Sequence, residues 1–170
     1  MALSVLIVMG SDSDLEQITP AWKVLESLDV SYEVMVASAH RSPERVVALA
    51  RSAREKGFGV ILAAAGGAAH LAGVIAANTT LPVVAVPVVV GTLGGVDALL
   101  SAVQMPGGVP IASVGIGGAR NAGFFAAAIL SATDAPLHAR LEAFRQEQAK
   151  NVELADARVQ VKLGRATPTS

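Results

Sequence analysis

Three short segments of the sequence carry side chains that could do chemistry, and each follows an apolar run. They are GSDSD (10–14), SAHRSP (38–43) and AAAGGAAHL (63–71). In parallel α/β sheets, ligands bind beyond the carboxyl ends of the strands. If the three apolar runs are strands of one such sheet, the three segments form one ligand site.

The segment SAHRSP sets a histidine beside an arginine. His40 has the side chain best matched to proton transfer near neutral pH. Arg41 can bind a phosphate through two parallel hydrogen bonds. Taken singly, His40 could be a satisfied structural histidine and Arg41 a member of a surface ion pair. Their adjacency at a strand end, opposite GSDSD, favours a binding site.

The segment GSDSD suits a phosphate and a sugar. Backbone N–H groups and the hydroxyls of Ser11 and Ser13, at the start of a helix, could hold phosphate. Asp14 could accept hydrogen bonds from sugar hydroxyls, as the acidic residue of dinucleotide folds does. Taken alone, the motif is better explained as an N-cap and turn, because Ser and Asp are common at such positions.

The segment AAAGGAAHL combines two glycines with a dry, alanine-rich surrounding. Gly66 and Gly67 would let backbone amides approach a ligand closely. The spacing is not the G-x-G-x-x-G of a dinucleotide fingerprint, and a tight strand-to-helix turn is the alternative. For His70, in or just after this turn, we expect a supporting or structural role and not a catalytic one.

Several other chemistries are not indicated. His40, His70 and His138 lie in separate elements, and the chain has no cysteine, so we expect no metal site. There is no Walker loop and no G-x-S-x-G motif, which argues against ATP chemistry and serine hydrolysis. The net charge of −1 gives no electrostatic case for nucleic acid or an acidic membrane.

Strand and helix patterns alternate along the chain. They predict a parallel sheet with helices on both faces, most simply a flavodoxin-like three-layer α/β/α sandwich with an added C-terminal helix. We expect one catalytic domain over 1–170, with a core at about 3–133 and a helix and tail at about 134–170. The tail at 163–170 is expected to fray. The predicted strands are 3–9, 31–37, 59–65, 81–89 and 109–116. The predicted helices are 15–28, 43–57, one after a turn within 66–78, one within 91–108, 117–132 and 134–153. Ser42 is the expected N-cap of the second helix, with Pro43 at its first position.

Charge is distributed unevenly. Between Lys56 and Asp134 the only formally charged residues are Asp97 and Arg120. The segment at 68–78 is apolar nearly all round, as for a helix that is buried on every side. A central position within one chain would explain this, but so many apolar helical faces favour cover by neighbouring subunits. We therefore expect a homo-oligomer.

The apolar N-terminal run is not typical of a signal peptide. No basic residue precedes it, and GSDSD follows it where a cleavage site would have small residues. Hydrophobic residues make up 52% of the chain, but Gly, Pro, Asn or Asp interrupts each apolar run before it reaches the length of a membrane span. We expect a cytoplasmic protein without a membrane partner.

Taken together, five motifs resemble the N5-carboxyaminoimidazole ribonucleotide mutase family of purine biosynthesis. The resemblance runs in register from about 3 to about 144. It implies a flavodoxin-like fold, a homo-octamer, and an enzyme that moves a carboxyl group from the exocyclic nitrogen of an aminoimidazole ribonucleotide to ring carbon C4. It implies CO₂ as a bound intermediate and no cofactor. The motifs are MGSDSD, SAHRSP, AAAGGAAHLAGVIAA, GGVDALLSAVQMPGGVPIASV and NAGFFAAAIL.

The same resemblance implies roles for particular residues. His40 matches the catalytic general acid/base of the family's S-A-H-R motif. The substrate-binding positions of the first two loops match Ser11, Ser13, Asp14, Ser38 and Arg41. The family's glycine loop matches Gly66, Gly67, Ala68, Ala69, His70 and Leu71.

The sequence departs from the family pattern at a few positions and leaves two other functions open. Ala72 stands where the family commonly has Pro, and Gly94 and Ala98 stand where it has Ser. A sister group that carboxylates aminoimidazole ribonucleotide directly with CO₂ has a G-R-S-N type loop in place of 66–70, so it resembles this chain less. A non-catalytic sensor of nucleotide phosphates would need Arg41 and the serines but no base at His40.

Overall fold

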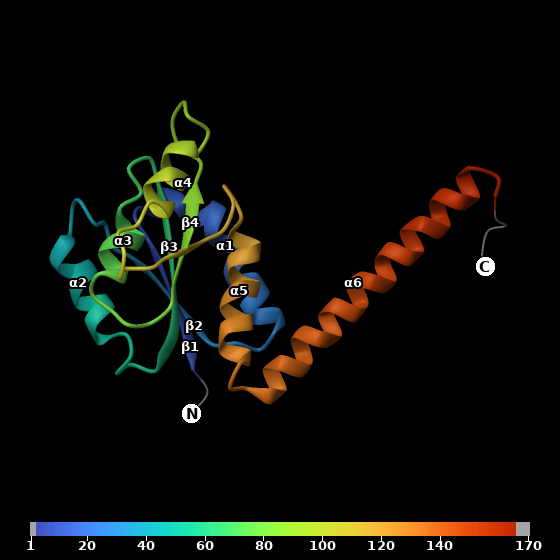
Figure 1. Ribbon diagram of the computed structural model, residues 1–170, viewed down its shortest axis with the longest axis horizontal. Coiled ribbons are helices and arrows are strands. Elements are labelled where there is room, and N and C mark those ends of the chain that lie inside the picture. The colour runs from blue at the N-terminus through green and yellow to red at the C-terminus, as the bar shows by residue number, and fades with distance from the viewer. Residues whose placement is uncertain (1–2, 166–170) are drawn as a thin grey trace.

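The computed structural model describes residues 3–165 (Figure 1). Strands and helices alternate, as predicted, up to a long final helix. The elements are β1 (Ser4–Met9), a short 3₁₀ helix η1 (Asp12–Asp14), α1 (Leu15–Ser27), β2 (Tyr32–Val36), α2 (Pro43–Ser52), β3 (Phe58–Gly66), α3 (Leu71–Ala76), β4 (Val83–Val88), α4 (Val96–Val103), β5 (Ala112–Ser113), α5 (Ala119–Ser131) and α6 (Ala135–Lys162).

The five strands form one parallel sheet in the order β2-β1-β3-β4-β5. This is the flavodoxin-like order, which confirms the predicted topology. The chain leaves β1 toward β2 on one side and then returns to β3 on the other. Met9 pairs with Val36 of β2 and with Ala64 of β3, so β1 and β2 end at one level of the sheet and β3 ends two residues beyond it, at Gly66. The three loops with polar motifs therefore meet at the switch in strand order.

Alternate side chains of β1 point to opposite faces of the sheet and belong to two separate cores. Val5, Ile7 and Met9 pack with buried residues of α1 and α5. Leu6 and Val8 pack with buried residues of α2 and α3 on the other face. Figure 1 shows α1 and α5 on one side of the sheet and α2 and α3 on the other. Both faces are covered at the central strands β3 and β4, which are buried over most of their length, whereas the edge strand β2 is partly exposed.

Several element boundaries differ from the predictions. β5 spans only Ala112–Ser113 and not 109–116. Its late start fits Pro110, which has no N–H to donate to a ladder. α2 ends at Ser52, and turns lead through Gly57, at φ +86°, into β3. α3 has six residues and follows a turn, as predicted. Its Leu71, Ala72 and Ile75 are buried in this chain, whereas Gly73, Val74 and Ala76 are half-buried. The prediction of subunit contacts on this helix stays a prediction.

The final helix α6 extends away from the rest of the molecule (Figure 1). It continues to Lys162, beyond the predicted end at 153, because no Gly or Pro interrupts the chain between Pro136 and Gly164. Of the tail that was expected to fray, 163–165 form a turn and 166–170 lie outside the described residues. Within 3–165, no helix is both long enough and apolar enough to cross a membrane.

Candidate active site

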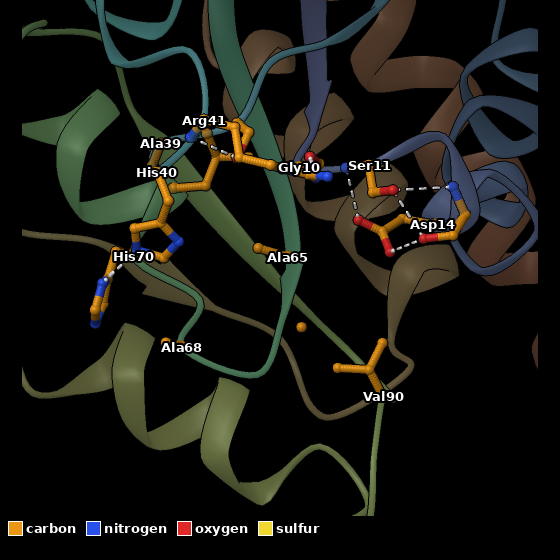
Figure 2. Close-up of a pocket in the computed structure, with 14 residues that line it drawn as sticks. Gly10, Ser11, Asp14, Ala39, His40, Arg41, Ala65, Ala68, His70 and Val90 are labelled. Atoms are coloured by element: carbon orange, nitrogen blue, oxygen red, sulfur yellow. Dashed lines mark hydrogen bonds between the residues drawn. The ribbon is translucent and has the colours of Figure 1, made fainter.

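The loop after β1 is held together by its own side chains. Ser11 caps η1, and its hydroxyl accepts a hydrogen bond from the Ser13 N–H at 3.4 Å. The Asp14 carboxylate accepts from the Ser11 N–H at 3.2 Å, which completes a reciprocal capping box. The Ser13 hydroxyl donates to the Ser11 hydroxyl at 3.0 Å. The loop thus presents a fixed group of hydroxyls beside the cavity (Figure 2).

Asp14 is a buried carboxylate, with only 5% of its surface exposed. Burial raises its pKa above the usual value, and this effect is partly offset by the hydrogen bonds from Ser11 and Ser13 and by the charge of Arg41. Aspartate is seldom buried to this degree, and the sequence motif did not predict it. A carboxylate has about four lone-pair positions, so Asp14 keeps acceptor capacity for a ligand hydroxyl.

The loop after β2 folds around Ser38. The Ser38 hydroxyl accepts from the Arg41 N–H at 3.2 Å and from Arg41 Nε at 3.3 Å. Arg41 Nη2 donates to the Gly10 carbonyl at 2.9 Å, so the guanidinium joins the second loop to the first. The bonds from Nε and Nη2 use two of the five guanidinium N–H groups, and the other three can bind an anion.

Ser42 begins α2 with Pro43 at the first helical position, as predicted. Ser42 is the N-cap residue, but its hydroxyl makes no capping bond to the helix. The hydroxyl instead accepts from the Ser38 N–H at 3.0 Å and lies 3.2 Å from the Ser38 carbonyl. Pro43 supplies no N–H, and the hydroxyl closes the turn that carries His40 and Arg41.

The two histidines of the site contact each other (Figure 2). His40 comes from the second loop, and His70 immediately precedes α3. His40 Nε2 lies 2.8 Å from His70 Nδ1, and the rings meet edge to face at 84° with their centres 5.0 Å apart. The structure therefore places His70 beside the predicted base, consistent with a supporting role.

The glycine loop after β3 depends on a side chain from another loop. A Cβ on Gly66 would strike the Val90 side chain and lie 3.0 Å from the Val88 carbonyl oxygen. Gly67 turns the chain at φ +62°, a conformation that favours glycine. Only a residue without a side chain at 66 lets the loop after β4 approach this closely.

These loops enclose a cavity of about 300 Å³. The predicted site residues line it except Gly67 and the buried Ala69 of the glycine loop. Gly10, Ala39 and Ala65 belong to the three predicted motifs, so their presence follows from those motifs. Val90 gave no signal in the sequence, because it belongs to an apolar segment. The lining residues are Gly10, Ser11, Ser13, Asp14, Ser38, Ala39, His40, Arg41, Ala65, Gly66, Ala68, His70, Leu71 and Val90.

The lining has a polar part and an apolar part. The serines and Arg41 supply hydrogen-bond donors that suit a phosphate. Ala65, Ala68 and Val90 supply an apolar wall (Figure 2). His40 can exchange a proton with a ligand held between these parts. No group of three His, Asp or Glu residues within 3–165 is placed to hold a metal ion.

Comparison with known proteins places the chain in a family. Residues 4–151 match the AIR carboxylase family. The chain belongs to this family. This AIR carboxylase family member is 50% identical over 161 residues to the N5-carboxyaminoimidazole ribonucleotide mutase of Mycobacterium tuberculosis (strain ATCC 25618 / H37Rv), covering 95% of this chain and 92% of the relative. It is 53% identical over 148 residues to the protein of the same name from Bacillus subtilis (strain 168), covering 86% and 91%.

Solved structures share the fold of this AIR carboxylase family member. PurE of Treponema denticola aligns with a TM-score of 0.82 over 92% of this chain and 98% of that one, at 24% identity. A PurE2 variant from the same organism aligns with a TM-score of 0.84 over 94% and 99%, at 23% identity. Both the fold and the family predicted from the sequence motifs are thus confirmed.

Proposed function

We propose that this protein is an N5-carboxyaminoimidazole ribonucleotide mutase. It moves the carboxyl group from the exocyclic nitrogen to C4 and yields 4-carboxy-5-aminoimidazole ribonucleotide in purine (IMP) biosynthesis. The relatives that carry this name are about half identical along most of the chain. Within the structure, the supporting observation is an imidazole that lies between phosphate-binding side chains and an apolar wall in one cavity.

In this proposal the first two loops anchor the ribonucleotide. Arg41, Ser13 and Ser38 bind the 5′-phosphate, and Asp14 accepts from the ribose. Arg41 is already oriented by its bonds to Ser38 and Gly10, so little side-chain freedom is lost when the phosphate binds. Binding energy from these remote groups positions the reacting ring.

The glycine loop confines the carboxyl group in transit. The substrate carbamate releases CO₂ and leaves a nucleophilic aminoimidazole. The CO₂ must then stay beside C4, away from water, until the ring attacks it. Ala65, Gly66, Ala68 and Val90 form the apolar part of the lining that would hold it.

His40 completes the reaction as general base. After C4 attacks CO₂, that carbon carries both its hydrogen and the new carboxylate. His40 accepts the hydrogen as a proton, and the electron pair of the C–H bond restores the aromatic ring. In the reverse direction the same group is the acid.

Direct carboxylation of aminoimidazole ribonucleotide by CO₂ is the second candidate, since the family as a whole is described as AIR carboxylase. One assay separates the two. Purified protein is offered the carbamate ribonucleotide, and separately the uncarboxylated ribonucleotide with bicarbonate. A mutase converts only the first substrate rapidly. Rapid conversion of the second would establish the carboxylase, and binding without conversion of either would leave the non-catalytic sensor.

We also propose that the protein assembles as a homo-octamer and works in the cytoplasm. The octamer is what the family resemblance implies. Supporting it, Leu93 is 62% exposed and Leu100 is 53% exposed, and Val96 and Val103 of α4 are also exposed. Such a group of apolar side chains is typical of a surface that contacts another subunit.

A further inference from the structure

The contact between His40 and His70 holds a single hydrogen between two nitrogens. His40 Nε2 and His70 Nδ1 are 2.8 Å apart, a hydrogen-bond distance with room for one hydrogen and not for two. A neutral imidazole has one N–H and one lone pair, so one ring must donate and the other accept. The direction of this bond decides which nitrogen of His40 can act as a base.

The two directions leave His40 in different states. If His40 donates through Nε2–H, its Nδ1 carries the lone pair. The nitrogens of an imidazole diverge, so Nδ1 is directed away from His70 (Figure 2). If His70 donates instead, neutral His40 carries its hydrogen on Nδ1 and cannot take up a proton there. Only the first direction leaves His40 ready to accept a proton from a ligand.

We propose that His70 is a positioning residue that accepts the Nε2–H of His40 and so holds Nδ1 as the base. This inference rests on the proposed mutase reaction. Nδ1 takes the proton from C4, the electron pair stays with the ring, and His40 becomes an imidazolium. Its Nε2–H bond to His70 is then charge-assisted and roughly twice as strong as a neutral one. His70 thereby stabilises the charged form of His40 as it appears.

The backbone of His70 is fixed well enough for this role. Its N–H donates to the Ala68 carbonyl at 2.8 Å, and its own carbonyl accepts from the Val74 N–H at 3.0 Å in the first turn of α3. The next residue, Leu71, is buried in the core. These hydrogen bonds and the buried Leu71 fix the backbone that carries the acceptor ring, whereas His40 lies in a turn.

The other charged groups that line the cavity do not replace His70. Asp14 hydrogen-bonds to Ser11 within the first loop. Arg41 carries only donors and is bound to Ser38 and Gly10. Within the described lining, His70 is the group that contacts Nε2 of His40.

Two substitutions at one position test the proposal kinetically. Asn keeps an acceptor, because its Oδ1 stands two bonds from Cβ, as Nδ1 of histidine does; Leu has none. We expect His70→Leu to lower kcat about 10- to 100-fold, the usual value of a hydrogen bond to a charged group, with KM within a few-fold. We expect His70→Asn to keep kcat within a few-fold of the wild type. Equal kcat values for the two variants would overturn the proposal.

A spectroscopic experiment reads the hydrogen directly. The chain has three histidines, so ¹⁵N-histidine labelling of the full-length protein gives few signals, and His40→Asn assigns the one of interest. We expect neutral His40 to be protonated at Nε2 and unprotonated at Nδ1, and to become a mixture of tautomers in His70→Leu. His138→Asn, on α6, is the control and should change neither kcat nor the His40 signal. Protonation of neutral His40 at Nδ1 would refute the inference.

The nitrogen spectrum and the activity assay test different claims, so one can fail without the other. The nitrogen spectrum needs no substrate, so it tests the direction of the hydrogen bond even if the assays show another reaction. A wild-type protein without mutase activity would remove the proposed function. An active wild type with the opposite tautomer would remove only the role given to His70.

Discussion

The side-chain amide of Gln17, in the first turns of α1, pairs with both backbone polar groups of Val89. Gln17 Oε1 accepts from the Val89 N–H at 2.9 Å, and Gln17 Nε2 donates to the Val89 carbonyl at 3.0 Å. The two residues are 72 positions apart in the chain. This pair holds the base of the loop at 89–95, which brings Val90 against Gly66 and into the cavity lining.

Removing the Gln17 amide should loosen that loop. Gln17→Ala deletes two hydrogen bonds worth about 1 kcal/mol each. We expect faster hydrogen exchange at the Val89 amide and a several-fold lower kcat, because an ordered loop is needed to exclude water. Gln146→Ala, at an exposed position of α6, is the matched control. Unchanged protection of the Val89 amide would show that the pair does not hold the loop.

Substitutions at His40 and Arg41 should separate turnover from binding. His40→Asn removes the proposed base, so we expect kcat to fall about 10²- to 10⁴-fold while ribonucleotide affinity stays within a few-fold. Arg41→Lys keeps the charge but cannot bind both Ser38 and Gly10 and still offer a fork to phosphate, so affinity should fall about tenfold or more. Affinity for the nucleoside without phosphate should fall much less. Calorimetric titration measures the affinity, and steady-state kinetics measures the turnover. Full turnover in His40→Asn would remove His40 from the mechanism.

Two helical glycines should respond to alanine with opposite signs. On α5, a Cβ at Gly123 would strike the Ala21 carbonyl of α1 and lie 3.0 Å from Val24 Cβ. Gly123→Ala should therefore destabilise the fold by about 1–3 kcal/mol through overpacking. On α3, a Cβ at Gly73 meets the Met105 sulfur at an ordinary 3.6 Å. Gly73→Ala should stabilise by about 0.5–1 kcal/mol, the helical preference for alanine. Urea denaturation measures the free energy of unfolding of both variants. A lower value than the wild type in both would contradict the packing argument.

The burial of Asp14 predicts a pH-dependent effect on stability. Burial raises its folded pKa above the ordinary 3.8. Between 3.8 and the raised pKa, the folded chain binds more protons at this site than the unfolded chain, so the site's contribution to stability falls as pH rises through that range. Above it, ionised Asp14 destabilises the fold, and Asp14→Asn should be more stable than the wild type at pH 7. The difference should shrink as the pH falls through that range and should level off below 3.8.

Thermal unfolding of Asp14→Asn and the wild type across pH checks this sign. Asp12→Asn, an exposed aspartate of the same loop, is the control. We expect Asp14→Asn also to weaken ribonucleotide binding, because the Asp14 carboxylate is the proposed acceptor for the ribose. The variant would then gain stability and lose affinity. A variant that is less stable than the wild type at pH 7 would show that the Asp14 hydrogen bonds outweigh the cost of burial.

The exposed apolar surface near α4 predicts assembly. Light scattering at micromolar concentration should give a mass about eight times the 17.2 kDa of one chain. Leu100→Glu would place a charge on this surface and should reduce the mass. Gln146→Glu, on the exposed surface of α6, is a control for the added negative charge. A monomeric wild type would refute the proposed octamer.

Local pattern was enough to predict most of the fold. Alternating apolar runs and helical spacing identify five strands and their crossovers, because each pattern reports burial on one or both faces of an element. The errors occur at element ends. β5 starts later than predicted because Pro110 cannot donate to the ladder, and α6 is longer because an uninterrupted run of helix-forming residues needs no neighbour to continue.

By itself, the sequence determined which groups are the candidates for the reaction. His40, Arg41 and the first-loop serines stand out because strand ends in a parallel sheet face a ligand, and these residue types bind phosphate or move protons. Only the tertiary structure decided how those groups are supported. The contact of His40 with His70 spans 30 positions and that of Gln17 with Val89 spans 72. Such contacts depend on the spatial order of β1, β3 and β4, and strand order is a property of the whole packed sheet that local periodicity does not encode.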